Sequence, residues 1–121
     1  MNAVIYARVS STGDRQSTER QVVDLTEYAG KNNMTIVRIY EEHISGARKN
    51  RERLVLNECL TYAVNHGVDI ILISELSRLG RNVDEVLANI RFCKDRHLNI
   101  YFQKEGISIF DAYGKENPYL T

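Results

Sequence analysis

The chain has no tryptophan, one proline and two cysteines in 121 residues. It also has no excess charge, since 16 Lys and Arg residues balance 16 Asp and Glu residues. No apolar run approaches the roughly 20 residues of a membrane span, and no signal peptide precedes the first apolar segment. Because Cys59 and Cys93 are far apart and form no CxxC pair, we expect two reduced, buried thiols in a cytoplasmic protein.

The zero formal net charge constrains any interaction with nucleic acid. A domain that holds DNA unaided usually carries a basic excess, because neutralising phosphates supplies most of the non-specific affinity. If DNA is the partner, either the basic groups are concentrated in one cleft or another domain does the holding, and we favour the second. With 43% hydrophobic and 26% charged residues, the composition is that of one globular domain.

Strand and helix patterns alternate along the chain. Strands are predicted over residues 3–9, 34–42, 70–73 and 100–102, and helices over residues 18 to about 30, 51–66 and from 83 onward. Thr18 with Gln21, and Asn82 with Glu85, are predicted capping boxes. The last helix is expected to turn four apolar residues inward: Val83, Val86, Leu87 and Ile90. Residues 103–121 are predicted to form a polar tail.

This alternation predicts an α/β fold with three layers, α-β-α, and a mainly parallel central sheet of four or five strands. In such folds, ligands bind at the carboxyl ends of the strands. Polar clusters occur at these ends, over residues 10–16, 42–51 and 75–81. We therefore expect three loops to converge on one rim of the sheet.

The first predicted strand carries an arginine and ends in a hydroxyl group. Side chains alternate along a strand, so Tyr6, Arg8 and Ser10 project from one face. An arginine in a buried strand is costly unless it meets an anion, either a protein carboxylate or a substrate phosphate. A fixed cation beside a hydroxyl is what attack on a phosphodiester requires.

Each of these signals also has a purely structural interpretation. A serine after a strand is commonly a turn or cap residue, and Arg8 equally fits an ion pair with Glu42 or Glu75. Arg78 and Arg81 fit a solvated helix entry, although the helix dipole disfavours cations there. Their placement is easier to explain if both face an anion.

Several other kinds of site lack their motifs. There is no GxGxxG after the first strand and no GxxxxGK[ST] in the chain. His43, His66 and His97 lack metal-ligand spacing, so we expect them at the surface. The sequence therefore predicts neither a metal nor a cofactor.

Four short motifs occur in order and at compatible intervals: Tyr6-Ala7-Arg8-Val9-Ser10, Gln16-Ser17, Ser45-Gly46 and Leu76-Ser77-Arg78-Leu79-Gly80-Arg81. Together they resemble the catalytic domain of the serine recombinases, the resolvase/invertase family, from residue 3 to about 109. The resemblance implies a resolvase-like sheet and site-specific DNA recombination without metal or nucleotide. It also implies that Ser10 attacks a DNA phosphodiester, giving a 5′-phosphoserine link and a free 3′-hydroxyl. Strand alternation favours Ser10 over Ser11, because Ser10 shares the Arg8 face.

The resemblance assigns the other site residues by position. Arg8, Arg78 and Arg81 match the arginines that hold the scissile phosphate of the DNA. The matching supporting positions are Tyr6, Gln16, Gln21, Glu42, Ser45, Arg51 and Ser77. In two places the chain departs from the family, because Ser77 and Glu42 stand where aspartates are common. Ser77 cannot act as a carboxylate, so Glu42 is the better candidate for acid–base chemistry.

In the family, a long helix follows this domain, builds the dimer and leads to a separate DNA-binding region. Residues 110–121 show no long apolar heptad, so we expect a catalytic domain over residues 1–109 followed by a tail. Such a fragment would be weakly active or inactive alone, and the full-length protein would form dimers and tetramers. Two alternatives stay open: a flavodoxin-like or receiver-like binding module, and a family member used for assembly in which Ser10 is dispensable. The binding module leaves the three arginines unexplained.

Overall fold

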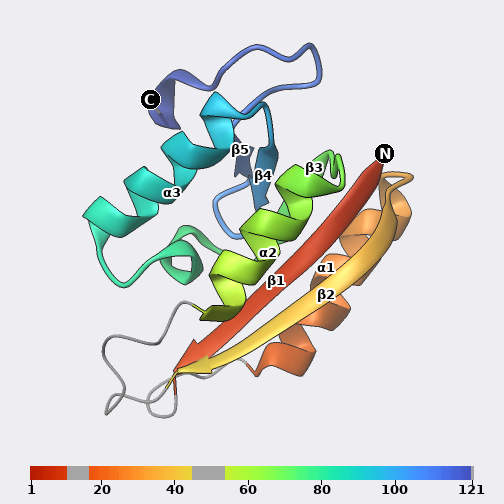
Figure 1. The fold of residues 1–121 in the computed structure, drawn as a ribbon. Coiled ribbons are helices and arrows are strands. Elements are labelled where there is room, and N and C mark those ends of the chain that lie inside the picture. The colour runs from red at the N-terminus through yellow and green to blue at the C-terminus, as the bar shows by residue number, and fades with distance from the viewer. Residues whose placement is uncertain (11–16, 45–53, 121) are drawn as a thin grey trace.

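The computed structural model describes residues 1–10, 17–44 and 54–120 (Figure 1). Its strands are β1 (Asn2–Ser10), β2 (Thr35–Ile44), β3 (Ile70–Ile73), β4 (Asn99–Phe102) and β5 (Ile107–Ser108). Its α-helices are α1 (Thr18–Lys31), α2 (Leu54–Asn65) and α3 (Val83–Asp95). Two short 3-10 turns are η1 (Leu76–Leu79) and η2 (Pro118–Leu120).

The strands form one five-stranded sheet in the order β2-β1-β3-β4-β5. The β2-β1, β1-β3 and β3-β4 pairs are parallel, and β5 runs antiparallel to β4. Helix α1 packs on one face of this sheet, while α2 lies on the opposite face, in front of β1 in Figure 1. The predicted α/β fold with a mainly parallel sheet is therefore confirmed.

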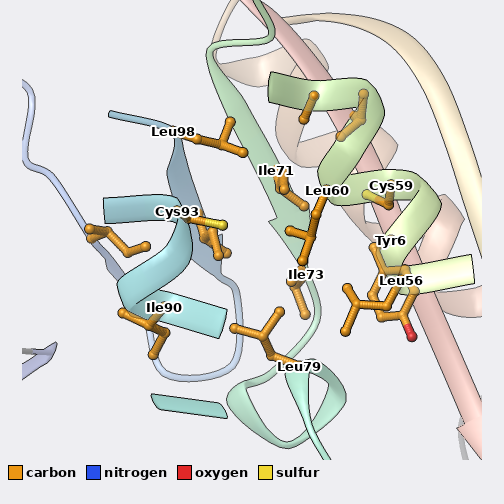
Figure 2. Close-up of a cluster of buried hydrophobic side chains, with 14 of the residues drawn as sticks. Tyr6, Leu56, Cys59, Leu60, Ile71, Ile73, Leu79, Ile90, Cys93 and Leu98 are labelled. Carbon is orange, nitrogen blue, oxygen red and sulfur yellow. The ribbon is translucent and has the colours of Figure 1, made fainter. Parts of the chain in front are cut away.

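The alternation of side chains along β1 divides the core into two clusters. Val4 and Tyr6 belong to the cluster beneath α2 and α3, whereas Ala3 and Ile5 belong to the cluster beneath α1. All four side chains are fully buried, because β1 lies inside the sheet with helices on both faces. Figure 2 shows side chains from β1, β3, α2, α3 and η1 meeting in the first cluster.

The two cysteines are free and buried, as expected from the sequence. Cys59 of α2 and Cys93 of α3 both contribute to the cluster shown in Figure 2. Burial disfavours the charged thiolate and raises the pKa of both thiols, that of Cys93 to about 12. Both groups therefore behave as small apolar side chains rather than as nucleophiles.

The helix starts agree with the sequence in one case and differ in the other. Asn82 caps α3 as predicted, accepting a hydrogen bond from Glu85 N at 2.9 Å. The N-cap of α1 is Ser17 and not Thr18, since Ser17 Oγ accepts from Arg20 N at 3.1 Å. Thr18 is buried inside the first turn instead. The predicted capping box was therefore one residue out of register.

The expectation that four apolar residues of α3 face inward is half wrong. Ile90 is buried and Val86 is half-buried, but Val83 and Leu87 are 71% and 43% exposed. The N-terminal turn of α3 packs against η1 and Gly80 rather than over the strands, so its outer apolar side chains meet no covering layer.

The segment expected to be a polar tail folds back on the domain. It contains β5, a bridge between Phe110 and Glu116, and η2. Ile109 and Leu120 are buried in the cluster beneath α2 and α3, and Lys94 of α3 pairs with Glu116 at 3.5 Å. The predicted domain boundary near residue 109 stays a prediction. Among the described residues, none of the helices is long and apolar enough to cross a membrane.

Candidate active site

The carboxyl ends of β1, β2 and β3 lie at one edge of the sheet, because these neighbouring strands are parallel. In this register Arg8 of β1 is opposite Glu42 of β2, and Ser10, the last residue of β1, is opposite Ile44. Strand β3 leads through the buried Ser74 into η1 at the same edge. The strand ends that carry the predicted rim therefore lie together, whereas residues 11–16 and 45–53 of its first two loops lie outside the described residues.

The backbone of Arg8 is held by a side chain from α1. Arg8 N donates to Gln21 Oε1 at 3.1 Å, and Gln21 Nε2 donates to Arg8 O at 3.0 Å. The register of β1 with β3 ends at Ile5, so the Gln21 amide takes the place of a strand partner beyond it. Ser74 Oγ donates to Gln21 Oε1 at 3.3 Å. The guanidinium of Arg8 reaches across to η1, where Nη2 donates to Ser77 O at 2.6 Å.

Glu42 is a buried carboxylate, 5% exposed, with hydrogen bonds to two other elements. The Tyr6 hydroxyl donates to Glu42 Oε1 at 2.5 Å, and Val55 N donates to Glu42 Oε2 at 3.3 Å. Burying a carboxylate requires such donors. Glu42 thereby joins β1 and β2 to the first turn of α2.

The turn η1 carries Arg78, which is only 7% exposed. Arg78 N donates to Glu75 O at 3.1 Å, and Arg78 Nη2 lies 3.9 Å from Glu75 Oε2. The sequence offered Glu75 as a partner for Arg8, whereas the structure pairs it with Arg78. Leu79 anchors the turn, because its side chain is fully buried in the cluster of Figure 2.

Arg81 lies just beyond η1 and pairs with the N-terminal turn of α3. Arg81 Nε and Nη2 lie 3.1 and 3.0 Å from Glu85 Oε2, and Arg81 N donates to Glu85 Oε1 at 3.0 Å. A Cβ atom at Gly80 would lie 2.7 Å from Glu85 Cβ and 2.7 Å from Val86 N. Glycine is therefore required by this close approach, and it allows η1 to dock on α3.

Arg8, Ser77 and Arg81 line one groove with a volume of about 680 Å³. The rest of its wall is mainly apolar and comes from η1, α3 and η2: Leu76, Gly80, Asn82, Val83, Val86, Leu87, Ile90, Tyr119 and Leu120. Two guanidinium groups beside an apolar wall can bind an oxyanion strongly, because the wall reduces competition from water. The arrangement suits a phosphate-containing substrate.

The structure brings together most, but not all, of the residues predicted for the site. Those that meet at the rim are Tyr6, Arg8, Gln21, Glu42, Ser77, Arg78 and Arg81. Gln16, Ser45 and Arg51 lie outside the described residues, and for Ser10 the structure gives the backbone position alone. The three histidines are exposed, as expected.

Sequence reasoning missed Ser74, which donates to Gln21. It named Glu75 as a partner for Arg8 and Glu85 as part of a capping box, but it missed their pairing with Arg78 and Arg81. Glu75 precedes Arg78 by three residues, and Glu85 follows Arg81 by four. These are ordinary spacings for ion pairs on a helix, so the sequence contained a signal for both pairs. Ser74 gave no signal, because its partner is 53 residues away.

Comparisons with known proteins identify the fold. Among solved structures, the N-terminal catalytic domain of TP901-1 integrase superposes with a TM-score of 0.77 at 22% identity, covering 94% of this chain and 85% of that one, which shows a shared fold. A resolvase family site-specific recombinase from Streptococcus pneumoniae superposes with a TM-score of 0.71 at 25% identity, covering 89% and 75%.

Sequence comparisons identify the family. A resolvase/recombinase of Pseudomonas putida is 34% identical over 91% of this chain and 55% of its own length. The Tn1546 resolvase of Enterococcus faecium is 32% identical over 98% of this chain and 54% of its own length, so the chain spans about half of these relatives. The model of the resolvase N-terminal domain matches residues 3–117. The chain therefore belongs to the resolvase family of serine recombinases, with residues 3–117 matching the family's N-terminal domain.

Proposed function

We propose that this chain cuts and rejoins DNA at specific sites, with Ser10 as the nucleophile. The observation that carries the proposal is the groove that both Arg8 and Arg81 line, at the edge of the sheet where β1 ends in Ser10. Arg78, in η1, is proposed to supply a third guanidinium at this edge. Family membership supports recombination as the overall reaction.

In the proposed reaction the Ser10 hydroxyl oxygen attacks the scissile phosphorus, and the bond from phosphorus to the 3′-oxygen breaks. The serine proton is lost to solvent or a nearby base, and the 3′-oxygen gains a proton and leaves as a hydroxyl. The new bond is a 5′-phosphoserine ester. Attack by a 3′-hydroxyl reverses the step after strand exchange. The phosphoester bond conserves the energy of the broken link, so rejoining requires no nucleotide.

The three arginines are proposed to stabilise the charge that develops on the phosphate. Guanidinium groups bind phosphate oxygens through two parallel hydrogen bonds, and fixed cations lower the barrier of phosphoryl transfer. Glu42 is proposed to support the site by fixing Tyr6 and the start of α2, and it is the candidate for proton transfer among the predicted residues.

DNA is proposed as the substrate, and dimers and tetramers as the assemblies of the full-length protein. The relatives are about twice the length of this chain, which has no net charge. Both facts support the proposal that tight DNA binding depends on regions beyond this domain, and that residues 1–121 alone recombine poorly. We propose that the protein acts in the cytoplasm.

Covalent trapping tests the proposal. The full-length protein is incubated with DNA fragments from either side of its own gene, and fragments bound in a mobility-shift assay serve as substrates. We expect wild type and Ser11→Ala to form a protein–DNA adduct that survives denaturation, and Ser10→Ala to form none. Arg81→Lys should form it at least about a hundredfold more slowly, because lysine keeps the charge but loses the paired hydrogen bonds.

Two results would contradict the proposal. An adduct with Ser10→Ala would show that another residue is the nucleophile. No adduct with any variant, on DNA that is bound, would favour a binding or assembly role instead.

A further inference from the structure

Glu75 sits immediately before η1, and its two carboxylate oxygens have different partners. Glu75 Oε1 accepts a hydrogen bond from Ser77 Oγ at 2.6 Å, and Glu75 Oε2 lies 3.9 Å from Arg78 Nη2. The Glu75 side chain is 23% exposed and that of Arg78 is 9% exposed. The pair is therefore shielded from most of the solvent, which strengthens its electrostatic attraction.

Glu75 has no role in holding the backbone of η1 through its side chain. It is the N-cap residue of this turn, but its side chain makes no capping hydrogen bond. The first N–H of η1, that of Leu76, is instead bound by Glu105 Oε1 at 3.1 Å. The two glutamates therefore have different roles. Glu105 holds the backbone of η1, and Glu75 faces Arg78.

We propose that Glu75 is a positioning residue, whose negative charge fixes the buried Arg78 guanidinium for the scissile phosphate. This inference rests on the proposed function. A separation of 3.9 Å is longer than the roughly 2.7–2.9 Å of a charge-assisted hydrogen bond, so the contact between Glu75 and Arg78 is an electrostatic one. Glu85, by contrast, accepts a hydrogen bond directly from Arg81.

The hydroxyl of Ser77 provides a way to separate charge from structure. Glu75→Gln keeps an oxygen that accepts from Ser77 but removes the negative charge. Because Ser77 Oγ is 2.6 Å from the carboxylate, Ser77→Asp places a new carboxylate in nearly the same position. The double variant Glu75→Gln/Ser77→Asp therefore restores the charge beside Arg78 from a different residue.

The experiment measures the single-turnover rate of adduct formation and the DNA affinity of the full-length protein. We expect Glu75→Gln to slow the adduct by about 10- to 100-fold with DNA affinity within about twofold, because misplacing a catalytic group affects the reaction more than binding. The double variant should form the adduct at least about tenfold faster than Glu75→Gln does. Glu105→Gln, the matched control, should react at the wild-type rate.

Three outcomes would overturn the inference while leaving the proposed function intact: an adduct rate unchanged in Glu75→Gln, a rate increased in it, or no recovery in the double variant. If Glu105→Gln slows the adduct as much as Glu75→Gln does, the order of η1 rather than the charge of Glu75 sets the rate, and the inference is also overturned. If wild type forms no adduct on bound DNA, the proposed function fails and the inference fails with it.

Discussion

The side chain of Gln21 binds both the N–H and the C=O of Arg8. The two hydrogen bonds are 3.1 and 3.0 Å long, and Gln21 is completely buried. A side-chain amide has the same donor and acceptor groups as a peptide, so it can pair with an extended backbone as a neighbouring strand does. Helix α1 therefore fixes the position of β1 where the strand extends beyond its pairing with β3.

Gln21→Leu should lower the free energy of unfolding by about 2–4 kcal/mol, because two backbone groups lose their buried partner. Urea unfolding followed by circular dichroism measures this change. Gln103→Leu is the control: Gln103 is half-buried and donates to Asp24 O at 3.5 Å, so its loss should be below about 1 kcal/mol. Equal losses in the two variants would contradict the strand-like role of Gln21.

Tyr6 and Glu42 should be energetically coupled. Tyr6→Phe leaves a buried carboxylate without its 2.5 Å hydrogen bond and should destabilise the domain by about 1.5–3 kcal/mol. In a double-mutant cycle with Glu42→Gln, the coupling energy should be about 1 kcal/mol or more. Tyr113→Phe, at a position that is 95% exposed, should have no effect. Additive losses at Tyr6 and Glu42 would show that their hydrogen bond contributes little.

Two glycines should respond to alanine with opposite signs. Gly80→Ala places a Cβ 2.7 Å from Val86 N, so η1 and α3 must separate, and we expect a loss of about 1–3 kcal/mol. Gly30→Ala lies in α1 with no atom within 4 Å of the new Cβ, and should gain about 0.5–1 kcal/mol from helix propensity. Thermal unfolding of both variants checks the pair. If Gly80→Ala leaves the free energy of unfolding unchanged, η1 and α3 accommodate the new Cβ without cost.

The buried thiols should make the domain less stable at alkaline pH. Burial raises the pKa of Cys59 and Cys93 from 9.0, the latter to about 12. Below pH 9 both thiols stay protonated in the folded and unfolded states. Above pH 9 the unfolded chain loses these protons while the folded domain keeps them, so stability falls by about 1.4 kcal/mol per pH unit for each thiol.

Urea unfolding between pH 8.5 and 10.5 measures that slope. Tyrosines also ionise in this range, so the informative comparison is with Cys93→Ala, which keeps every tyrosine. The free energy of unfolding of Cys93→Ala should fall less steeply with pH than that of wild type. The two slopes should differ by about 1 kcal/mol per pH unit. Parallel pH profiles for the two proteins would show that Cys93 is not protected from ionisation by burial.

The sequence predicted the sheet better than the surface of the helices. The apolar runs of β1 and β3 are buried on both faces, and such runs have few alternatives to a central parallel strand. The apolar spacing of α3 gave no means of telling which side chains would be covered. Val83 and Leu87 fit the same helical face as Ile90, yet they are exposed, because the N-terminal part of α3 docks on η1 and Gly80 rather than on the strands. Coverage depends on the neighbouring elements, which a local pattern does not contain.

By itself, the sequence determined the α/β order of elements, the motif that ends β1 and the arginine-containing turn after β3, because these depend on local periodicity and on residue types close in the chain. The tertiary structure alone decided the partners at the rim. Gln21 was matched to Arg8, Glu42 to Tyr6 and the Ser77 carbonyl to the Arg8 guanidinium by strand register and helix docking. A buried polar group must bind whichever partner the fold brings within hydrogen-bond distance, and that choice is made across the sheet rather than along the chain.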